Sequence, residues 1–246
     1  MKKNEVAEAI ILKKQEYREK DELITALSKD QGRITVVARG VLSLQSKNAS
    51  SLLPGSTSEL VFNTEGKRAL YSLARSSFMV SRAYLLNDLE KSTCFQVIAE
   101  IIDHLTSGME EDPKANYELT AWALDALKDH DPKLVLSLFI SNALKLFGIE
   151  PYVDGCVSCG DPHVIAFSVE EGGFICPACA EKLNVAAEDV SFMKQLRIIC
   201  KAAPKNIDVC AQLDRIDEIN DRLIAFYERH SGARVKSYAF WRKVTS

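Results

Sequence analysis

Two Cys-x-x-Cys pairs constrain this chain of 246 residues more than any other feature of its sequence. Cys156 and Cys159 are followed, after sixteen further residues, by Cys176 and Cys179. Two pairs at roughly this separation are typical of zinc sites, because each short turn directs two sulfurs toward one point. Since four thiolates complete a tetrahedral shell, we predict one structural Zn²⁺ ion that orders the local chain and activates no water.

A redox function is the competing interpretation, because Cys176-Pro-Ala-Cys179 resembles the motif of thioredoxin-like proteins. That motif is expected between a strand and a helix and without a second pair nearby, so the first pair favours metal binding. Three further cysteines, Cys94, Cys200 and Cys210, have no partner at metal-like spacing. We expect Cys94 and Cys200, which fall in predicted helices, to be small core residues.

The sequence also indicates the cellular compartment in which the protein works. The first residues, Met1 to Glu5, are charged, and no apolar segment with a small-residue cleavage site follows them. The most apolar stretch, Leu134 to Phe147, is interrupted by polar residues and is too short for a membrane span. We therefore predict a cytoplasmic protein that has no membrane partner and no disulfide framework.

The charge is unevenly distributed along the chain, although the formal net charge is only −3. Residues 1–81 contain 13 Lys or Arg against 9 Asp or Glu, whereas residues 82–150 contain 6 against 12. A basic first third on an acidic body suggests a local anionic partner, although the same excess also fits a solvated surface.

The first eighty residues carry the pattern of short strands. Residues 32–39 are the most regular, since Ile34, Val36 and Ala38 alternate with polar or exposed-type positions. Asp30-Gln31-Gly32 predicts a hairpin turn, and further short runs follow at 59–63 and 69–76. About five short strands predict a small closed barrel, because closure removes exposed sheet edges.

After residue 85 the apolar period changes to that of helices. We predict helices from about residue 85 to 108, around 117–127, at 134–147, at about 188–202 and at about 209–229. Asp131 and Pro132 mark the start of the third helix as N-cap and first helical residue. The fold class is therefore α+β, with a barrel domain at 1–81, a helical domain at 82–246 and an inserted zinc module at about 152–183.

Enzyme motifs are absent from the sequence. It contains neither a Gly-x-Gly-x-x-Gly segment after a strand nor a phosphate-binding Gly-x-x-x-x-Gly-Lys-Ser/Thr segment. The four histidines are far apart in the chain. We therefore expect a binding protein and not an enzyme, although distant residues can assemble a catalytic site.

Taken in order, these parts resemble the RecO family of bacterial recombination mediators. The resemblance depends on residues 30–40, Asp-Gln-Gly-Arg-Ile-Thr-Val-Val-Ala-Arg-Gly, on the Leu-Phe-Gly-Ile-Glu-Pro junction at 146–151, on the cysteine spacing and on Ser-Gly-Ala-Arg-Val-Lys-Ser at 231–237. It covers essentially the whole chain. It implies a five-stranded OB-fold that binds single- and double-stranded DNA, a helical domain and no enzymatic turnover.

The resemblance also implies the partners. RecO proteins anneal complementary DNA strands. With RecR they promote the loading of RecA on DNA coated by single-strand DNA-binding protein, whose acidic C-terminal tail they contact. The expected location is the bacterial cytoplasm, in association with the nucleoid, and the expected process is recombinational DNA repair in the RecFOR pathway.

Six residues of the barrel are candidates for DNA binding, as phosphate contacts or, in one case, as a stacking aromatic: Arg33, Arg39, Lys47, Lys67, Arg68 and Tyr71. An aromatic residue in a strand, such as Tyr71, is more often part of the core. Many relatives follow Arg-Gly with a strongly basic run, whereas here residues 41–46 carry no charge. The resulting loop predicts weaker DNA affinity or a greater dependence on RecR.

A second candidate surface lies near the C-terminus, where cations occur among aromatic residues. It would contact DNA or an acidic peptide tail through Arg229, Arg234, Lys236, Trp241, Arg242 and Lys243. A solvated terminus is the simpler alternative. For the chain as a whole, the rival hypotheses are a zinc-ribbon nucleic-acid factor outside recombination, a Cys-x-x-Cys redox protein and an architectural partner-binding protein.

Overall fold

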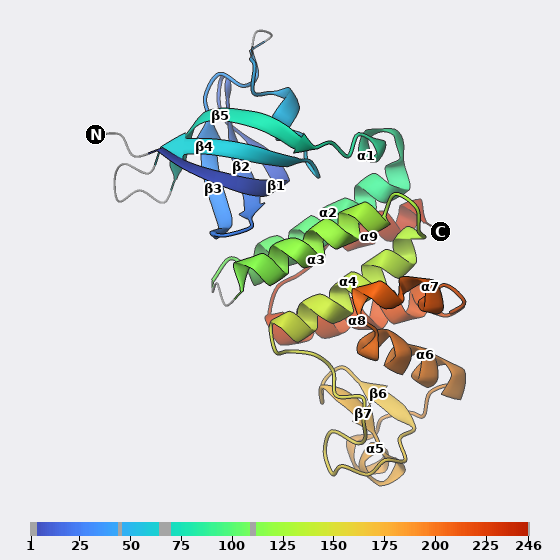
Figure 1. Ribbon diagram of the computed structural model, residues 1–246. Coiled ribbons are helices and arrows are strands. Elements are labelled where there is room, and N and C mark those ends of the chain that lie inside the picture. Colours follow the sequence, from blue (N-terminus) through green and yellow to red (C-terminus); the bar gives the residue numbers. More distant parts are fainter. Residues whose placement is uncertain (1–3, 44–45, 64–69, 109–111, 246) are drawn as a thin grey trace. The chain divides into compact units, whose positions relative to one another are not determined.

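The computed structural model describes residues 4–43, 46–63, 70–108 and 112–245, in which the chain forms two compact units (Figure 1). Unit 1 comprises Met1–Lys128 and Phe240–Ser246, and unit 2 comprises Asp129–Ala239. The first helices therefore group with the barrel in unit 1. The predicted domain boundary between residues 81 and 82 stays a prediction. Within the described residues, none of the helices is both long and apolar enough to span a lipid bilayer.

Unit 1 begins with a closed five-stranded barrel. Its strands are β1 (Asn4–Arg18), β2 (Asp21–Ser28), β3 (Gly32–Ala38), β4 (Thr57–Asn63) and β5 (Tyr71–Val80), with a 3₁₀ turn η1 (Ser50–Leu52) before β4. The strand order is β1-β2-β3-β5-β4, in which β3 and β5 are parallel and β1 closes antiparallel on β4. This is an OB-like barrel followed by helices, which confirms the predicted fold class.

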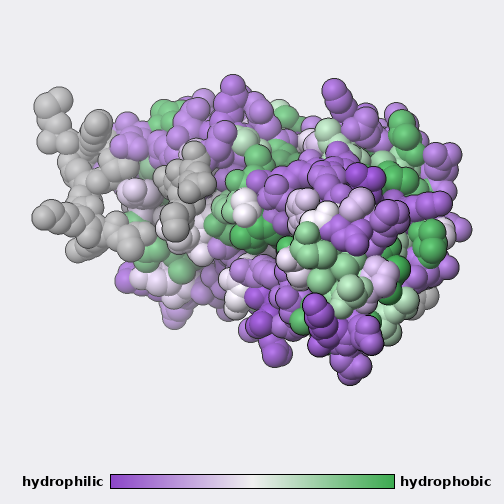
Figure 2. All heavy atoms as spheres, turned by 90° about the horizontal axis from the view of Figure 1, so that it is seen from below, coloured by the Kyte–Doolittle hydropathy of each residue, from purple (hydrophilic) through white to green (hydrophobic). Residues whose placement is uncertain are grey.

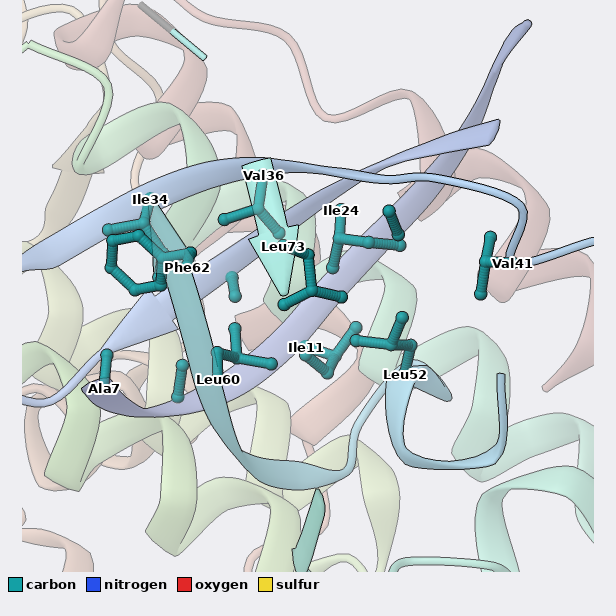
Figure 3. Packing of buried hydrophobic residues seen from close by; sticks show 13 residues of the cluster. Ala7, Ile11, Ile24, Ile34, Val36, Val41, Leu52, Leu60, Phe62 and Leu73 are labelled. Atoms are coloured by element: carbon teal, nitrogen blue, oxygen red, sulfur yellow. The ribbon is translucent and has the colours of Figure 1, made fainter. Parts of the chain in front are cut away.

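The barrel closes because alternate side chains of each strand share one apolar interior. Along β3 every second residue is buried, as the alternation around Ile34 and Val36 predicts. Figure 3 shows side chains from several strands converging on this interior, among them Ile24, Phe62 and Leu73. Val41 and the 3₁₀ residue Leu52 are buried in the same cluster.

Three helices complete unit 1 before the chain enters unit 2: α1 (Tyr84–Asn87), α2 (Leu89–Leu105) and α3 (Pro113–Ala126). Asp88 and Asp112 cap α2 and α3, since each carboxylate accepts a hydrogen bond from a backbone amide of the first turn. Both helices were predicted at these places. Tyr117 on α3 donates a hydrogen bond to Glu8 on β1, with an O–O distance of 2.7 Å, and so connects the helix to the barrel.

Asp103 on α2 ties the barrel to this helix more strongly. Its buried carboxylate lies 2.6 Å from Nζ of Lys13 on β1 and 2.5 Å from Nε of Arg33 on β3. Burial raises the pKa of Asp103, but the hydrogen bonds and charges of Lys13 and Arg33 outweigh this effect, so that the pKa lies below its usual value of 3.8. The Asp103 carboxylate thus forms ion pairs with two cations on the barrel strands, Lys13 and Arg33.

We expect Asp103→Asn to lower the free energy of unfolding by about 1–3 kcal/mol at pH 7, because two cations lose their charged acceptor. The lowered pKa means that this stabilisation is present above the unfolded-state pKa, about 3.9, and is lost as the pH falls through the folded-state value. Urea denaturation at several pH values between 7 and 3 measures the effect. The difference between the two proteins should shrink toward pH 3, and a difference independent of pH would contradict the assignment.

The matched control for this experiment is Glu59→Gln on β4. Glu59 pairs with Arg75 at 3.5 Å, but both side chains are largely exposed. An exposed pair of this kind contributes little, so we expect a change within about 0.5 kcal/mol at any pH.

Unit 2 is built on α4 (Pro132–Leu146), which packs against α8 (Ile216–Ser231). The Asp131 carboxylate caps α4 by accepting from the Lys133 amide, as predicted, and Gly148 ends the helical segment with a φ of 65°. Asn220 on α8 is fully buried, and its amide accepts from Ser137 Oγ and donates to the Lys133 carbonyl, both at 2.9 Å. These two bonds fix the register of the helix pair, since a buried amide needs both partners.

The remaining elements of unit 2 correct one prediction. They are β6 (Ala166–Ser168), β7 (Gly173–Ile175), α5 (Pro177–Leu183), α6 (Val190–Lys201), the 3₁₀ turn η2 (Pro204–Asn206), α7 (Ile207–Cys210) and the first residues of α9 (Lys236–Val244). The predicted single helix from about 209 to 229 was wrong, because the chain leaves helical geometry between Cys210 and Ile216. The Gln195 side chain of α6 accepts hydrogen bonds from the Asp214 and Arg215 amides, each at 3.1 Å, and so stabilises the non-helical segment before α8.

The surface carries both hydrophilic and apolar side chains. On the face shown in Figure 2, hydrophilic side chains dominate, and apolar side chains form patches between them. The exposed apolar residues of unit 2 include Val190 and Ile198 on α6.

Candidate nucleic-acid interface and metal centre

The four cysteines meet at one point of the cysteine module, by which we mean residues 152–183. All four sulfurs lie within 4.8 Å of one another. Two turns carry them: Cys156 and Cys159 lie in the loop after α4, and Cys176 is the residue that precedes α5, whose first turn contains Cys179. The predicted pairing of the two Cys-x-x-Cys motifs is thus present in space.

The β6–β7 hairpin between the pairs brings the two turns together. Its two strands pair from Ala166–Ile175 to Ser168–Gly173. Glycine is required at 173, because a Cβ atom there would lie 2.3 Å from the Tyr152 carbonyl oxygen. Ala166, Ile175 and Ala180 form one small apolar cluster of the module, and Val153, Phe167 and Phe174 are also buried. A segment this short buries few apolar side chains, so a crosslink adds to its stability.

The sulfur geometry fits a tetrahedral metal ion. The Sγ atoms of Cys159 and Cys176 are 3.6 Å apart, and a tetrahedron with metal–sulfur bonds of about 2.3 Å has an edge of about 3.8 Å. Burial raises the pKa of Cys156, but backbone amides of Cys176, Ser158 and Cys159 outweigh it and lower the value to about 6. Hydrogen bonds that the Cys179 thiol donates to Cys176 and Cys159 stabilise its protonated form and raise the pKa of Cys179 to about 12. The positions of the four sulfurs could hold a metal ion, and binding as four thiolates would release the protons that they carry.

On the barrel, a groove of about 570 Å³ brings together two of the predicted DNA-binding residues. It is lined at its charged end by Arg39, which follows β3, and by Arg18 at the end of β1. Tyr71 at the start of β5 and Tyr17 on β1 supply aromatic rings. Among the described residues that line this groove, none is Asp or Glu. Two guanidinium groups and two phenol rings thus face one open space.

Tyr71 occupies a position between the barrel core and the groove. Its side chain is half-buried, packs against the barrel core and lies 5.2 Å from the Phe62 ring, measured between centroids. It also lines the groove. Tyr17 is 39% exposed, and the Arg18 guanidinium lies 5.0 Å from its ring centroid, which is a cation–π contact.

Tyr17 and Arg18 were not among the residues predicted to bind DNA. Residues 15–18 at the end of β1 are all exposed, but exposure is common at strand ends and carries no functional signal alone. The signal that could have found them is the adjacency of an aromatic and an arginine at the end of a strand that leads into a tight turn.

The other predicted barrel residues lie elsewhere. Arg33 forms an ion pair with Asp103 and does not line the groove, although part of its side chain is exposed. Lys47 is exposed between β3 and β4. Lys67 and Arg68 lie outside the described residues. The assignment of all six residues to DNA binding stays a prediction.

The predicted C-terminal surface needs one correction. Trp241 is fully buried, so its ring cannot form part of an exposed contact; it lies in helix α9, which sequence analysis treated as a tail. Arg229 forms an ion pair with Glu170 at 2.7 Å, and Arg234, Lys236 and Lys243 are exposed. Arg242 is partly exposed. Arg242 and Lys243 belong to unit 1 and the other three cations to unit 2.

Comparisons with known proteins agree with this architecture. Residues 1–82 match the family model described as Recombination protein O N terminal, and residues 86–239 match Recombination protein O C terminal. A DNA repair protein RecO from Listeria monocytogenes serotype 4b is 26% identical over 247 aligned residues, covering 98% of this chain and 94% of that protein. The RecO proteins of Bacillus pumilus (25%, 98% and 94%) and Moorella thermoacetica (27%, 97% and 90%) are similar to the same extent.

Proposed function

The chain belongs to the RecO family of DNA repair proteins, and from this premise we propose that it acts, without enzymatic turnover, as a DNA-binding recombination mediator. It binds single- and double-stranded DNA and anneals complementary strands. With RecR it promotes the loading of RecA on DNA coated by single-strand DNA-binding protein, whose acidic tail is a further partner. It works in the bacterial cytoplasm, in association with the nucleoid.

The observation that carries this proposal is the groove of the barrel. Arg18 and Arg39 offer planar donors to phosphate oxygens, and Tyr17 and Tyr71 offer rings on which bases can stack. Such contacts do not depend on sequence, since every nucleotide has a phosphate and a base with an aromatic face. A protein that holds single strands in this way leaves their base-pairing edges free for a complementary strand.

Zinc is the ion that we assign to Cys156, Cys159, Cys176 and Cys179. Four thiolates in a tetrahedron select zinc or an iron centre, and zinc needs no redox partner. When bound, the ion supplies a crosslink between the two turns of the cysteine module. The four cysteines fill its coordination shell, so the module orients its neighbours and performs no hydrolysis.

Strand annealing tests the proposal directly. Two complementary labelled single strands are mixed with the zinc-loaded protein, without any nucleotide cofactor, and duplex formation is followed by fluorescence. We expect annealing well above the spontaneous rate, with less acceleration as salt rises, because phosphate contacts weaken with salt. A protein that binds each strand but does not accelerate pairing would instead be a zinc-containing nucleic-acid factor outside recombination.

A further inference from the structure

The two arginines of the groove lie on turns that hydrogen bonds join to each other. Arg18 ends β1 and Arg39 follows β3, and β2 lies between these two strands in the barrel. Asp21, the first residue of β2, pairs with Arg18 across the β1–β2 ladder. Its carboxylate reaches the other way and accepts a hydrogen bond from the Gly40 amide, with an N–O distance of 2.9 Å. Asp21 thus connects the turn that carries Arg18 to the turn that carries Arg39.

Two further contacts hold the turn after β3. The Leu42 amide donates a hydrogen bond to the Lys20 carbonyl at 3.2 Å, which is a second link between the two turns. Val41 is buried, and its side chain belongs to the apolar cluster of the barrel (Figure 3). The paired turns, by which we mean residues 18–21 and 39–43, are therefore one connected element fixed to the barrel core.

Arg39 is followed by the residue type with the greatest backbone freedom. Gly40 has a φ of 63°, and a glycine has other conformations of similar energy available to it. The Arg39 side chain is exposed, so its position depends mainly on how firmly the backbone of this turn is held. By binding the Gly40 amide, the Asp21 carboxylate restricts the backbone directly after Arg39.

Asp21 acts on a turn other than its own. Aspartate in a turn commonly accepts a hydrogen bond from an amide two residues further on, whereas Asp21 and Gly40 are nineteen residues apart in the chain. Asp21 does not line the groove. A carboxylate this close to two phosphate-binding arginines also repels phosphates, so its charge alone works against DNA binding. What Asp21 contributes to the groove is the hydrogen bond.

We propose that Asp21 is a positioning residue of the DNA interface. By holding the Gly40 amide it keeps Arg39 in place beside Arg18, so that both guanidinium groups meet the phosphates of one strand without first being ordered. Such preorganisation improves affinity, because less conformational entropy is lost when the strand binds. The inference rests on the proposed function, in which this groove binds DNA, and it adds a residue that acts on DNA only through Arg39.

Two substitutions at Asp21 separate position from charge. Asp21→Asn removes the charge but keeps an oxygen that can accept from Gly40, whereas Asp21→Ala removes both. If only the charge mattered, both variants would bind single-stranded DNA more tightly than the wild type. We expect instead that Asp21→Ala binds about fivefold more weakly and that Asp21→Asn binds at least as tightly as the wild type. Anisotropy of a labelled oligothymidylate at low salt, with the full zinc-loaded chain, measures these affinities.

The Arg39→Gln background tests whether the effect passes through Arg39. In a chain that already lacks this guanidinium, Asp21→Ala should change the affinity by less than about twofold, since a positioning residue then has nothing to position. A fivefold loss in this background as well would show that Asp21 acts by general destabilisation and would overturn the inference. Hydrogen exchange of the Gly40 amide gives a readout without DNA, and it should be faster in Asp21→Ala than in the wild type or Asp21→Asn.

The matched control is Asp30→Ala. Asp30 is exposed in the turn between β2 and β3, at the end of β2 opposite to Asp21, and it does not line the groove. This variant removes the same charge from the barrel without touching the paired turns. Its affinity for the oligothymidylate should stay within about twofold of the wild-type value.

The results separate this inference from the proposed function. A wild-type chain that binds the oligothymidylate, with Asp21→Ala binding equally well or better, overturns the inference and leaves the proposed function standing. The inference also fails if Asp21→Asn binds as weakly as Asp21→Ala, or if Gly40 exchange is the same in all three proteins, because the accepted hydrogen bond then does not position the turn. A wild-type chain that does not bind single strands contradicts the proposed function, and this inference with it.

Discussion

Cys176→Ser is expected to abolish stoichiometric zinc binding and to unfold the cysteine module. Cys176 supplies one of four sulfurs that lie within 4.8 Å of one another, and three remaining thiolates leave the tetrahedron open. Structural zinc contributes on the order of 10 kcal/mol of apparent binding energy near neutral pH, and the few apolar side chains that so short a module buries supply much less. Replacing any of the other three cysteines of the cluster should have the same effect.

Zinc content by atomic absorption and thermal unfolding by circular dichroism measure this effect. We expect one zinc per wild-type chain, less than one per mutant chain and a lower melting temperature, which chelation should reproduce in the wild type. Cys210→Ala is the matched control, because Cys210 is also buried but lies outside the cluster. Its zinc content should equal that of the wild type. A wild-type protein that keeps its full thermal stability after complete chelation would rule out a structural metal.

The second large effect concerns the groove of the barrel. We expect the double reversal Arg18→Glu and Arg39→Glu to weaken single-stranded DNA binding about a hundredfold at low salt, because two phosphate contacts become repulsive. For single strands each lost contact removes about 0.7 from the slope of log affinity against log salt, so the slope should become flatter by about 1.4. Gel shifts or anisotropy across a salt series give both numbers.

Two further variants make this experiment specific. Arg75→Glu is the matched control, since Arg75 is a highly exposed arginine of β5 outside the groove, and it should alter affinity by less than about threefold. Tyr17→Ala should cost about tenfold if its ring stacks on a base. Unchanged affinity and slope in the double mutant would remove the groove from the DNA interface.

Arg18 and Arg39 are better suited to this DNA-binding experiment than Arg33, which was also predicted to bind DNA. A reversal at Arg33 breaks the contact with Asp103 and places two carboxylates side by side. Any loss of DNA binding in Arg33→Glu would then combine a lost phosphate contact with a destabilised barrel. The variant is informative only when its urea denaturation curve is measured beside its affinity.

Features determined by neighbouring residues could be predicted from the sequence. Alternation over residues 32–38 placed Ile34, Val36 and Ala38 in the barrel core, and Asp131-Pro132 set the start of α4. The cysteine spacing gave the cluster, since a two-residue turn leaves little freedom for the paired sulfurs. In each case the decisive hydrogen bonds or steric limits act within a few residues of the chain.

Contacts between distant segments could not be predicted in this way. The break before α8 depends on Gln195, about twenty residues earlier, and Arg33 meets Asp103 across seventy residues. Trp241 was predicted on the surface because its neighbours are basic, yet its own helix turns it into the interior. An arginine can pair with a carboxylate or remain in solvent, and a tryptophan beside basic residues can be buried or exposed. Only the folded chain shows which residues surround each of them.

By itself, then, the sequence determined that this protein has a closed barrel, a helical body and a four-sulfur cluster. The tertiary structure decided which charged and aromatic residues share a surface: Tyr17 and Arg18 lie with Arg39 and Tyr71 in the groove. The reason is that backbone geometry is set over a few bonds, whereas a binding surface is made by segments that only the folded chain brings together.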